Sequence, residues 1–125
     1  MKWEIEKNLR EDPYISQHVH NSIKFYEYPP TDKMEGIYIV IDPLDVPIPS
    51  EFADNQPLTN DYLYQVEVWS KNGELNELVA KRVSKVMQEI GFAQGSGVDE
   101  YDKSLEVFRD ARQYRGKFYD QETIK

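Results

Sequence analysis

The residues best suited to chemistry are two histidines, His18 and His20, which are separated by one valine. If this segment were a strand, both imidazoles would lie on one face, an arrangement that suits a metal ion. No third ligand follows at a suitable spacing, and the segment is equally compatible with a helix. We therefore expect surface or hairpin histidines, with no metal and no cofactor bound.

Other catalytic patterns are missing from the sequence. The chain holds no cysteine, and its serines lie outside any G-x-S-x-G motif. The glycines of residues 93–98 match neither of the glycine-rich phosphate-binding motifs. Carboxylates are numerous, so chance pairs are expected and acid–base chemistry cannot be assigned to any of them. The sequence offers no candidate catalytic residue.

A basic cluster near the C-terminus contrasts with the acidic chain and contains Arg109, Arg112, Arg115 and Lys117. On a strand, Arg112 would face one way and the other three the opposite way. Such a face either guards a strand edge against aggregation or forms a rim that pairs with acidic residues of a neighbouring subunit. Trp69 is either covered by the N-terminal helix or an interface anchor, and burial within its own chain is favoured.

Composition limits the classes of partner. The 125 residues carry a formal net charge of −8, with a pI of about 4.7. This length fits a single domain, which we expect over residues 1–118, followed by a flexible tail at 119–125. We expect no direct nucleic-acid specificity, because affinity for phosphate backbones comes mainly from Lys and Arg. A membrane partner is disfavoured for the same reason, and no run resembles a signal peptide or a transmembrane helix.

A strand followed by a long helix is the strongest structural signal. Residues 62–71 alternate between two faces and predict a strand. Its apolar face holds Tyr62, Tyr64, Val66 and Val68. Residues 75–90 carry an apolar stripe at helical spacing. The members of this stripe are Leu75, Leu78, Val79, Val83, Val86, Met87 and Ile90. Asn72 or Gly73 is the expected N-cap, and residues 91–92 predict a Schellman motif at the other end.

The N-terminal third predicts two short helical pieces and two strands. Residues 2–10 form the first helix, and Asp12 can cap a further turn that begins at Pro13. Residues 22–28 and 37–41 predict strands that pair as an antiparallel hairpin. The second of these is apolar at every position, as in a strand buried on both faces.

Residues 42–59 predict a long loop. They contain Pro43, Pro47, Pro49 and Pro57 and show no periodicity. Long irregular loops in compact domains are uncommon and are usually functional or disordered. This one also carries the apolar residues Val46, Ile48 and Phe52. We expect them to settle either on the body of the domain or on a partner.

The C-terminal part is less clearly patterned. Residues 93–98 predict either an edge strand or a glycine-rich turn, and residues 99–102 a solvated acidic loop. Residues 105–118 predict a last long strand, with a helix over 103–112 as the alternative. Together the elements predict an α+β two-layer sandwich, in which a long helix and a short N-terminal helix cover one face of a mostly antiparallel or mixed sheet.

The order of these patterns resembles the tail-completion proteins of long non-contractile-tailed bacteriophages and prophages, also called tail terminators or tail-to-head joining proteins. Residues 62–69 look like that family's strand of the form Tyr-x-(Val/Ile)-x-(Val/Ile)-Trp. Residues 74–92 are similar to its long helix ending in Gly-Phe, and residues 101–116 to its closing Tyr-Asp…Arg-x-Tyr-x-Gly segment. The strand at 37–43 and the proline-rich loop also fit, so the resemblance covers most of residues 1–118.

The resemblance implies a structural protein that is not an enzyme and that forms a ring, typically a hexamer, at the head-proximal end of the tail tube. Such a ring stops tube polymerisation and docks on the connector of the head. The implied partners are further copies of the chain, the tail tube protein and the connector or stopper protein, with a monomer as an open alternative for the free chain. The implied location is the virion, and the host cytoplasm during assembly.

The family's motif fixes no catalytic or interface positions. The interface candidates come from the residues alone and are Trp69, Arg109, Arg115, Lys117, Val46, Ile48 and Phe52. Three other functions stay open: a connector or stopper protein of the same virion region, a non-viral adaptor that offers a sheet edge to one protein, and a metal-dependent hydrolase or nuclease using His18 and His20.

Overall fold

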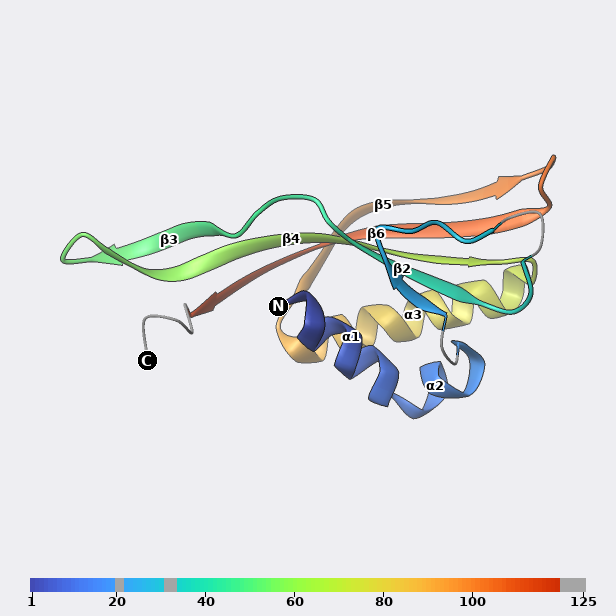
Figure 1. Cartoon of the computed structure of the whole chain (residues 1–125), viewed down its shortest axis with the longest axis horizontal. Helices are drawn as coiled ribbons and strands as arrows, with labels where there is room; N and C mark the ends of the chain where they lie inside the picture. Colours follow the sequence, from blue (N-terminus) through green and yellow to red (C-terminus); the bar gives the residue numbers. More distant parts are fainter. Residues whose placement is uncertain (20–21, 31–33, 120–125) are drawn as a thin grey trace.

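The computed structural model describes residues 1–19, 22–30 and 34–119, in which three helices cover one face of a six-stranded sheet (Figure 1). The elements in chain order are α1 (Lys2–Glu11), α2 (Pro13–Val19), β1 (Ile23–Phe25), β2 (Tyr38–Pro43), β3 (Ile48–Ala53), β4 (Gln56–Ser70), α3 (Gly73–Ile90), β5 (Ala93–Asp102) and β6 (Val107–Tyr119). The predicted α+β class is confirmed.

The sheet has the order β1-β2-β4-β6-β5, and β3 pairs with the outer part of β4. The pairs are antiparallel except for β1 with β2, which is parallel. The predicted antiparallel hairpin of residues 22–28 and 37–41 is therefore wrong. The connection over residues 26–37 is long enough for the crossover that a parallel pair needs, and Pro29 and Pro30 disfavour a tight turn.

The core lies between the sheet and the helices. Tyr64, Val66 and Val68 of β4 are buried in it, as their alternation predicts. The α3 residues buried there include Val79, Ala80, Val83 and Met87. Leu78 departs from the predicted stripe, because the buried face is rotated toward Asn76 and Ala80 and leaves Leu78 45% exposed.

Both ends of α3 have the predicted caps. Asn72, not Gly73, is the N-cap, and its side-chain oxygen accepts a hydrogen bond from the Leu75 amide at 3.1 Å. At the other end Gly91 has a φ of 120°, and the amides of Gly91 and Phe92 donate to carbonyls of the last turn. This pairing is the Schellman motif, so the long helix begins and ends where the sequence indicates.

Asp12 links α2 to α3 within the helix layer. Its carboxylate caps α2 by accepting from the Ile15 amide at 3.1 Å, and it also pairs with Arg82 of α3 at 2.6 Å. Burial opposes the charge of Asp12, but the hydrogen bonds from Arg82 and from backbone amides, together with the charge of Arg82, outweigh burial and lower the pKa of the carboxyl. The predicted second helix thus forms and is attached directly to α3.

Two predictions for the remaining segments are wrong. Residues 42–59 are mostly strand, because β3 and the start of β4 form a hairpin. Residues 99–102 belong to β5 and are not an acidic loop. The strand predicted over 105–118 is confirmed as β6, which pairs with β4 on one side and β5 on the other, so the helical alternative for 103–112 is wrong. Tyr119, which was predicted to belong to the tail, ends β6, and residues 120–125 lie outside the described residues.

Candidate assembly surface on the β3–β4 arm

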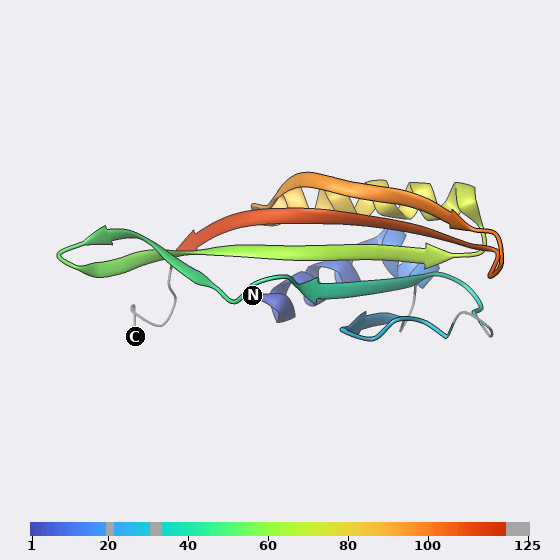
Figure 2. The same ribbon diagram turned by 90° about the horizontal axis from the view of Figure 1, so that it is seen from above.

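Residues 45–58, hereafter the arm, form a hairpin that projects beyond the helices along the long axis of the molecule (Figures 1 and 2). Its turn consists of Asp54 and Asn55, which have φ values of 51° and 63° between the paired Ala53 and Gln56. Two consecutive positive φ values define the type I′ turn, whose twist matches that of paired strands. The arm is therefore a defined strand pair.

Polar contacts fix the root of the arm. The hydroxyls of Ser50 and Thr59 lie 2.7 Å apart, and Ser50 also donates to Asp61 at 3.1 Å. Thr59 is buried and pairs with Tyr119 of β6 in the register of the sheet. Among the described residues, β4 has only β3 as its neighbour from Leu58 outward. Since two-stranded hairpins are only marginally stable in water, the arm depends on this root for its direction.

The prolines of this segment are compatible with strands because of where they lie. Pro49 is in β3, which pairs on one side only, with β4. Pro57 is in the stretch of β4 that β6 does not reach. An edge position does not need every backbone amide, so proline is tolerated there. The prolines, which predict a loop in the sequence, are therefore compatible with an extended and paired segment.

The arm exposes its apolar side chains. Val46 is 72% exposed, Ile48 48%, Phe52 63% and Leu58 44%. Within β3 only Ser50 is partly covered. Clustered apolar side chains with polar neighbours are typical of protein–protein contact sites. The structure thus brings three of the predicted interface residues, Val46, Ile48 and Phe52, onto one projecting element.

The charged residues of the arm, Asp45, Glu51 and Asp54, are all acidic. Lys117 of β6 lies 3.4 Å from Glu51 in an exposed ion pair at the side of the arm. Arg115 is exposed nearby and lines a shallow hollow together with Asp61, Tyr62, Gly116 and Lys117. Two of the predicted basic interface residues therefore lie at the root of the arm.

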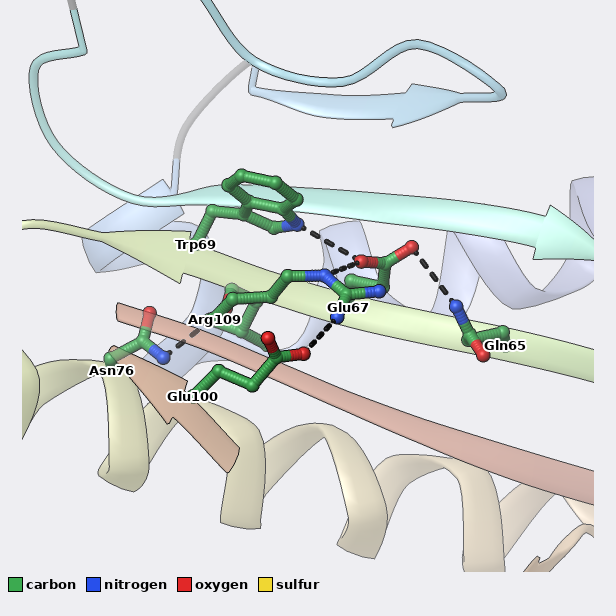
Figure 3. A network of polar contacts seen from close by, with 7 residues as sticks. Gln65, Glu67, Trp69, Asn76, Glu100 and Arg109 are labelled. Carbon is green, nitrogen blue, oxygen red and sulfur yellow. Dashed lines mark hydrogen bonds and ion pairs between the residues drawn. The ribbon is translucent and has the colours of Figure 1, made fainter. Parts of the chain in front are cut away.

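The other two predicted interface residues belong to a network on the helix-free face of the sheet (Figure 3). At its centre is Glu67, whose carboxylate is fully buried. It accepts hydrogen bonds from Gln65 at 3.1 Å, from the indole of Trp69 at 3.2 Å and from Arg109. Arg109 also pairs with Glu100 at 2.6 Å.

The network is held by charge and by ring contacts. The Arg109 guanidinium lies 5.6 Å from the centroid of the Trp69 ring. The centroids of the Tyr28 and Trp69 rings lie 5.7 Å apart. Burial opposes the charge of Arg109, but the hydrogen bonds and charges of Glu67 and Glu100 together outweigh burial and raise the pKa of Arg109. Burial and the neighbouring Glu67 raise the pKa of Asp42 on β2. Trp69 is half-buried here, so its predicted place under the N-terminal helix is wrong.

The histidines do not assemble a visible metal site. His18 is on α2, half-buried, with its ring 4.7 Å from that of Tyr14, and His20 lies outside the described residues. Within residues 1–19, 22–30 and 34–119, no group of three or more His, Asp or Glu side chains is placed to hold a metal ion. In the same ranges, no helix is long and apolar enough to cross a membrane.

Several residues of the arm and of the Glu67 network were not predicted from the sequence. Leu58 extends the apolar surface of the arm, and Tyr119, 72% exposed, ends the strand beside it. The available signal was Asp54-Asn55, a turn pair suited to positive φ, between two extended stretches. The buried Glu67 carried no comparable signal, because a single acid at an alternating position is indistinguishable from a solvated one.

Comparisons with known proteins add a likeness of fold. No family model and no curated protein sequence matches the chain. Among solved structures, the chain is similar to one titled "Virion of native gene transfer agent (GTA) particle", with a TM-score of 0.69. The match has 12% sequence identity and covers 93% of this chain and 92% of the other. At this identity the likeness establishes a shared fold over nearly the whole length of both chains.

Proposed function

We propose that this protein is a structural component of a phage-type particle that caps the head-proximal end of a tail tube and joins the tail to the head connector as a ring of identical copies. The observation that carries the proposal is the arm, which exposes apolar side chains on an element that reaches away from its own core. The fold shared with a chain from a gene transfer agent virion supports the same class of function.

The arm suits a ring better than a two-fold dimer. A projecting element that docks elsewhere on the next copy makes a heterologous contact, which closes into a ring when the rotation between copies allows. In such a ring every copy donates one arm and receives another. The hexamer remains a proposal that follows from the family resemblance.

The magnitudes favour assembly on a template. Burying each exposed apolar side chain of the arm stabilises the contact by roughly 1–2 kcal/mol. Association also costs several kcal/mol of lost translational and rotational freedom. One arm therefore gives a weak contact, whereas closure of a ring on the end of a tube secures each copy by two neighbours and by the tube. This accounts for a chain that is monomeric when free and becomes a ring at its target.

The proposed mechanism needs no catalytic residue. A ring seated on the last layer of the tube removes the surface to which the next tube subunit would add, so polymerisation stops. Its opposite face then serves as the docking surface for the head connector. The protein partners are the tube protein and the connector or stopper protein.

The test is to delete the gene from the phage or prophage that encodes it and to inspect the induced lysate by negative-stain electron microscopy. The proposal predicts filled heads lying apart from tails of irregular length, because neither capping nor joining occurs. A complementing copy of the wild-type gene should restore joined particles of uniform tail length. Normal virions from the deletion strain would contradict the proposal.

A further inference from the structure

We infer that the arm of one copy docks on the hollow between α2 and α3 of a second copy, with Phe52 over Leu78 and the acidic residues of the arm beside Lys81 and Lys85. This inference rests on the proposed ring and goes further by assigning the surface that receives the arm. The hollow has a volume of about 380 Å³ and is lined by Tyr14, Leu78, Lys81, Arg82 and Lys85.

The floor of this hollow is apolar and open to solvent. Leu78 is 45% exposed, although it stands within the apolar stripe of α3, and Tyr14 of α2 is half-buried beside it. An exposed leucine and an aromatic ring in one depression resemble the pockets that accept an aromatic anchor from a partner. Phe52, 63% exposed on β3, is the largest apolar side chain that the arm offers.

The rim of the hollow is basic on a chain whose net charge is −8. Arg82 is engaged by Asp12, but Lys81 and Lys85 form no ion pair with any described residue. Glu77 and Glu89 stand one helical turn from these lysines and form no ion pair with them either. The charged residues of the arm are all acidic. Most of the acidic surface of a second copy therefore repels the arm, whereas the basic rim of its hollow attracts the arm.

The contact cannot be made within one chain. The arm points away from the helix layer at one end of the long axis (Figures 1 and 2). The residues that line the hollow belong to α2 and α3 of that layer. The two complementary surfaces therefore belong to different copies. Because they are different patches of the same chain, repetition of the contact generates a ring or a helix of copies.

Disulfide trapping tests the pairing directly, since the chain has no cysteine of its own. Purified F52C and L78C variants are mixed at the highest soluble concentration and oxidised. The control mixture is F52C with L105C, because Leu105 in the β5–β6 turn is 40% exposed and thus as accessible as Leu78. We expect the F52C–L78C dimer to exceed the control dimer by about tenfold or more, because docking raises the local concentration of the two thiols. Equal yields would overturn the inference.

Charge reversal tests the rim and separates this inference from the proposed function. K81E/K85E should fail to complement the gene deletion, and addition of D45K/E51K on the arm should restore joined particles at the original net charge. The control K24E/K103E carries the same change of charge at exposed lysines outside the hollow and should complement fully. If F52S abolishes complementation while K81E/K85E behaves like the control, the ring proposal stands and the assigned receiving surface is wrong. If the deletion itself leaves virions intact, the proposed function fails.

Discussion

The two halves of β4 differ in how many strands lie beside them and in how exposed their side chains are. Along residues 62–70 the strand lies between β2 and β6, is covered by α3, and directs even the polar Glu67 into a closed set of partners. Along residues 56–58 the same strand has, within the described part of the chain, only β3 beside it, and the apolar Leu58 faces water. One continuous strand thus links a self-sufficient core to an incomplete surface.

The difference separates the groups that hold the fold from those available to a partner. Trp69 and Arg109 look like interface residues in the sequence, but internal contacts already occupy them. Val46, Ile48 and Phe52 have no comparable cover. Substitutions in residues 62–70 of β4 or in the side chains that contact them should therefore change the stability of the single chain. Substitutions in the arm should change assembly instead.

The largest effect is expected at Arg109. R109A removes the charged partner of the buried Glu67 carboxylate and leaves it the neutral donors Gln65 and Trp69. Breaking a buried pair in this way costs about 3 kcal/mol of unfolding free energy. Urea denaturation followed by tryptophan fluorescence measures it. R115A, on the same strand face but exposed, is the matched control and should remain within about 0.5 kcal/mol of wild type. Equal stability of the two variants would break the distinction between network and surface.

A smaller effect is expected at Asp12, which links α2 to α3 within the helix layer. D12A removes the cap of α2 and should lower the unfolding free energy by at least about 1 kcal/mol. D12N keeps an oxygen for the cap but loses the charge that pairs with Arg82. Because the pKa of Asp12 is lowered in the folded chain, its stabilisation is present above the pKa of the unfolded chain and is lost as pH falls through the folded value.

Denaturation curves over an acid series check this assignment. The wild type should lose its advantage over D12N as the pH falls through the folded pKa of Asp12. A constant difference between wild type and D12N across that range would show that the carboxylate charge plays no part in attaching α2.

A change of opposite sign is expected at Asp42. Burial and the neighbouring Glu67 raise the pKa of this carboxyl, so its ionised form is disfavoured in the folded chain. D42N removes that charge and should raise the melting temperature at neutral pH. The gain should disappear at pH values below the unfolded pKa, where the wild-type carboxyl is protonated in both states. A variant that is less stable at neutral pH would contradict this reading of the pair.

The smallest effect on the single chain is expected at Phe52, where the effect on assembly is large. F52S removes an exposed ring, so its unfolding free energy should stay within about 0.5 kcal/mol of wild type. The same variant should fail to join heads to tails in the complementation assay. S104A, an exposed substitution far from the arm, controls for the handling of the variants. A marked loss of stability in F52S would mean that the Phe52 side chain packs against its own chain.

Sequence reasoning was most successful where one local rule decided the structure. The strand at 62–71 and α3 follow from periodicity, and Asn72, Gly91 and Asp12 follow from capping chemistry. It failed where pairing with distant strands decides the outcome, as in the parallel β1–β2 pair and in residues 99–102, which pair with β6. In the arm, Pro49 and Pro57 outweighed the turn signal, because tolerance of proline depends on an edge position that only the assembled sheet defines.

The candidate surface was predicted in part. The apolar residues of segment 42–59 were predicted to settle either on the body of the domain or on a partner, and the arm presents Val46, Ile48 and Phe52 to solvent. The receiving hollow was not predicted, since Leu78 fits the buried stripe by spacing and its exposure depends on how α2 packs against α3. The internal role of Arg109 depends on Glu67 and Glu100, which lie far from it in sequence.

Hydrogen exchange on the free and assembled protein tests the central claim most directly. Amides of residues 46–58 should exchange fast in the free chain and become protected in the ring, while those of residues 62–70 should be equally protected in both states. Equal protection of the arm in the two states would contradict its role as the element that joins one copy to the next.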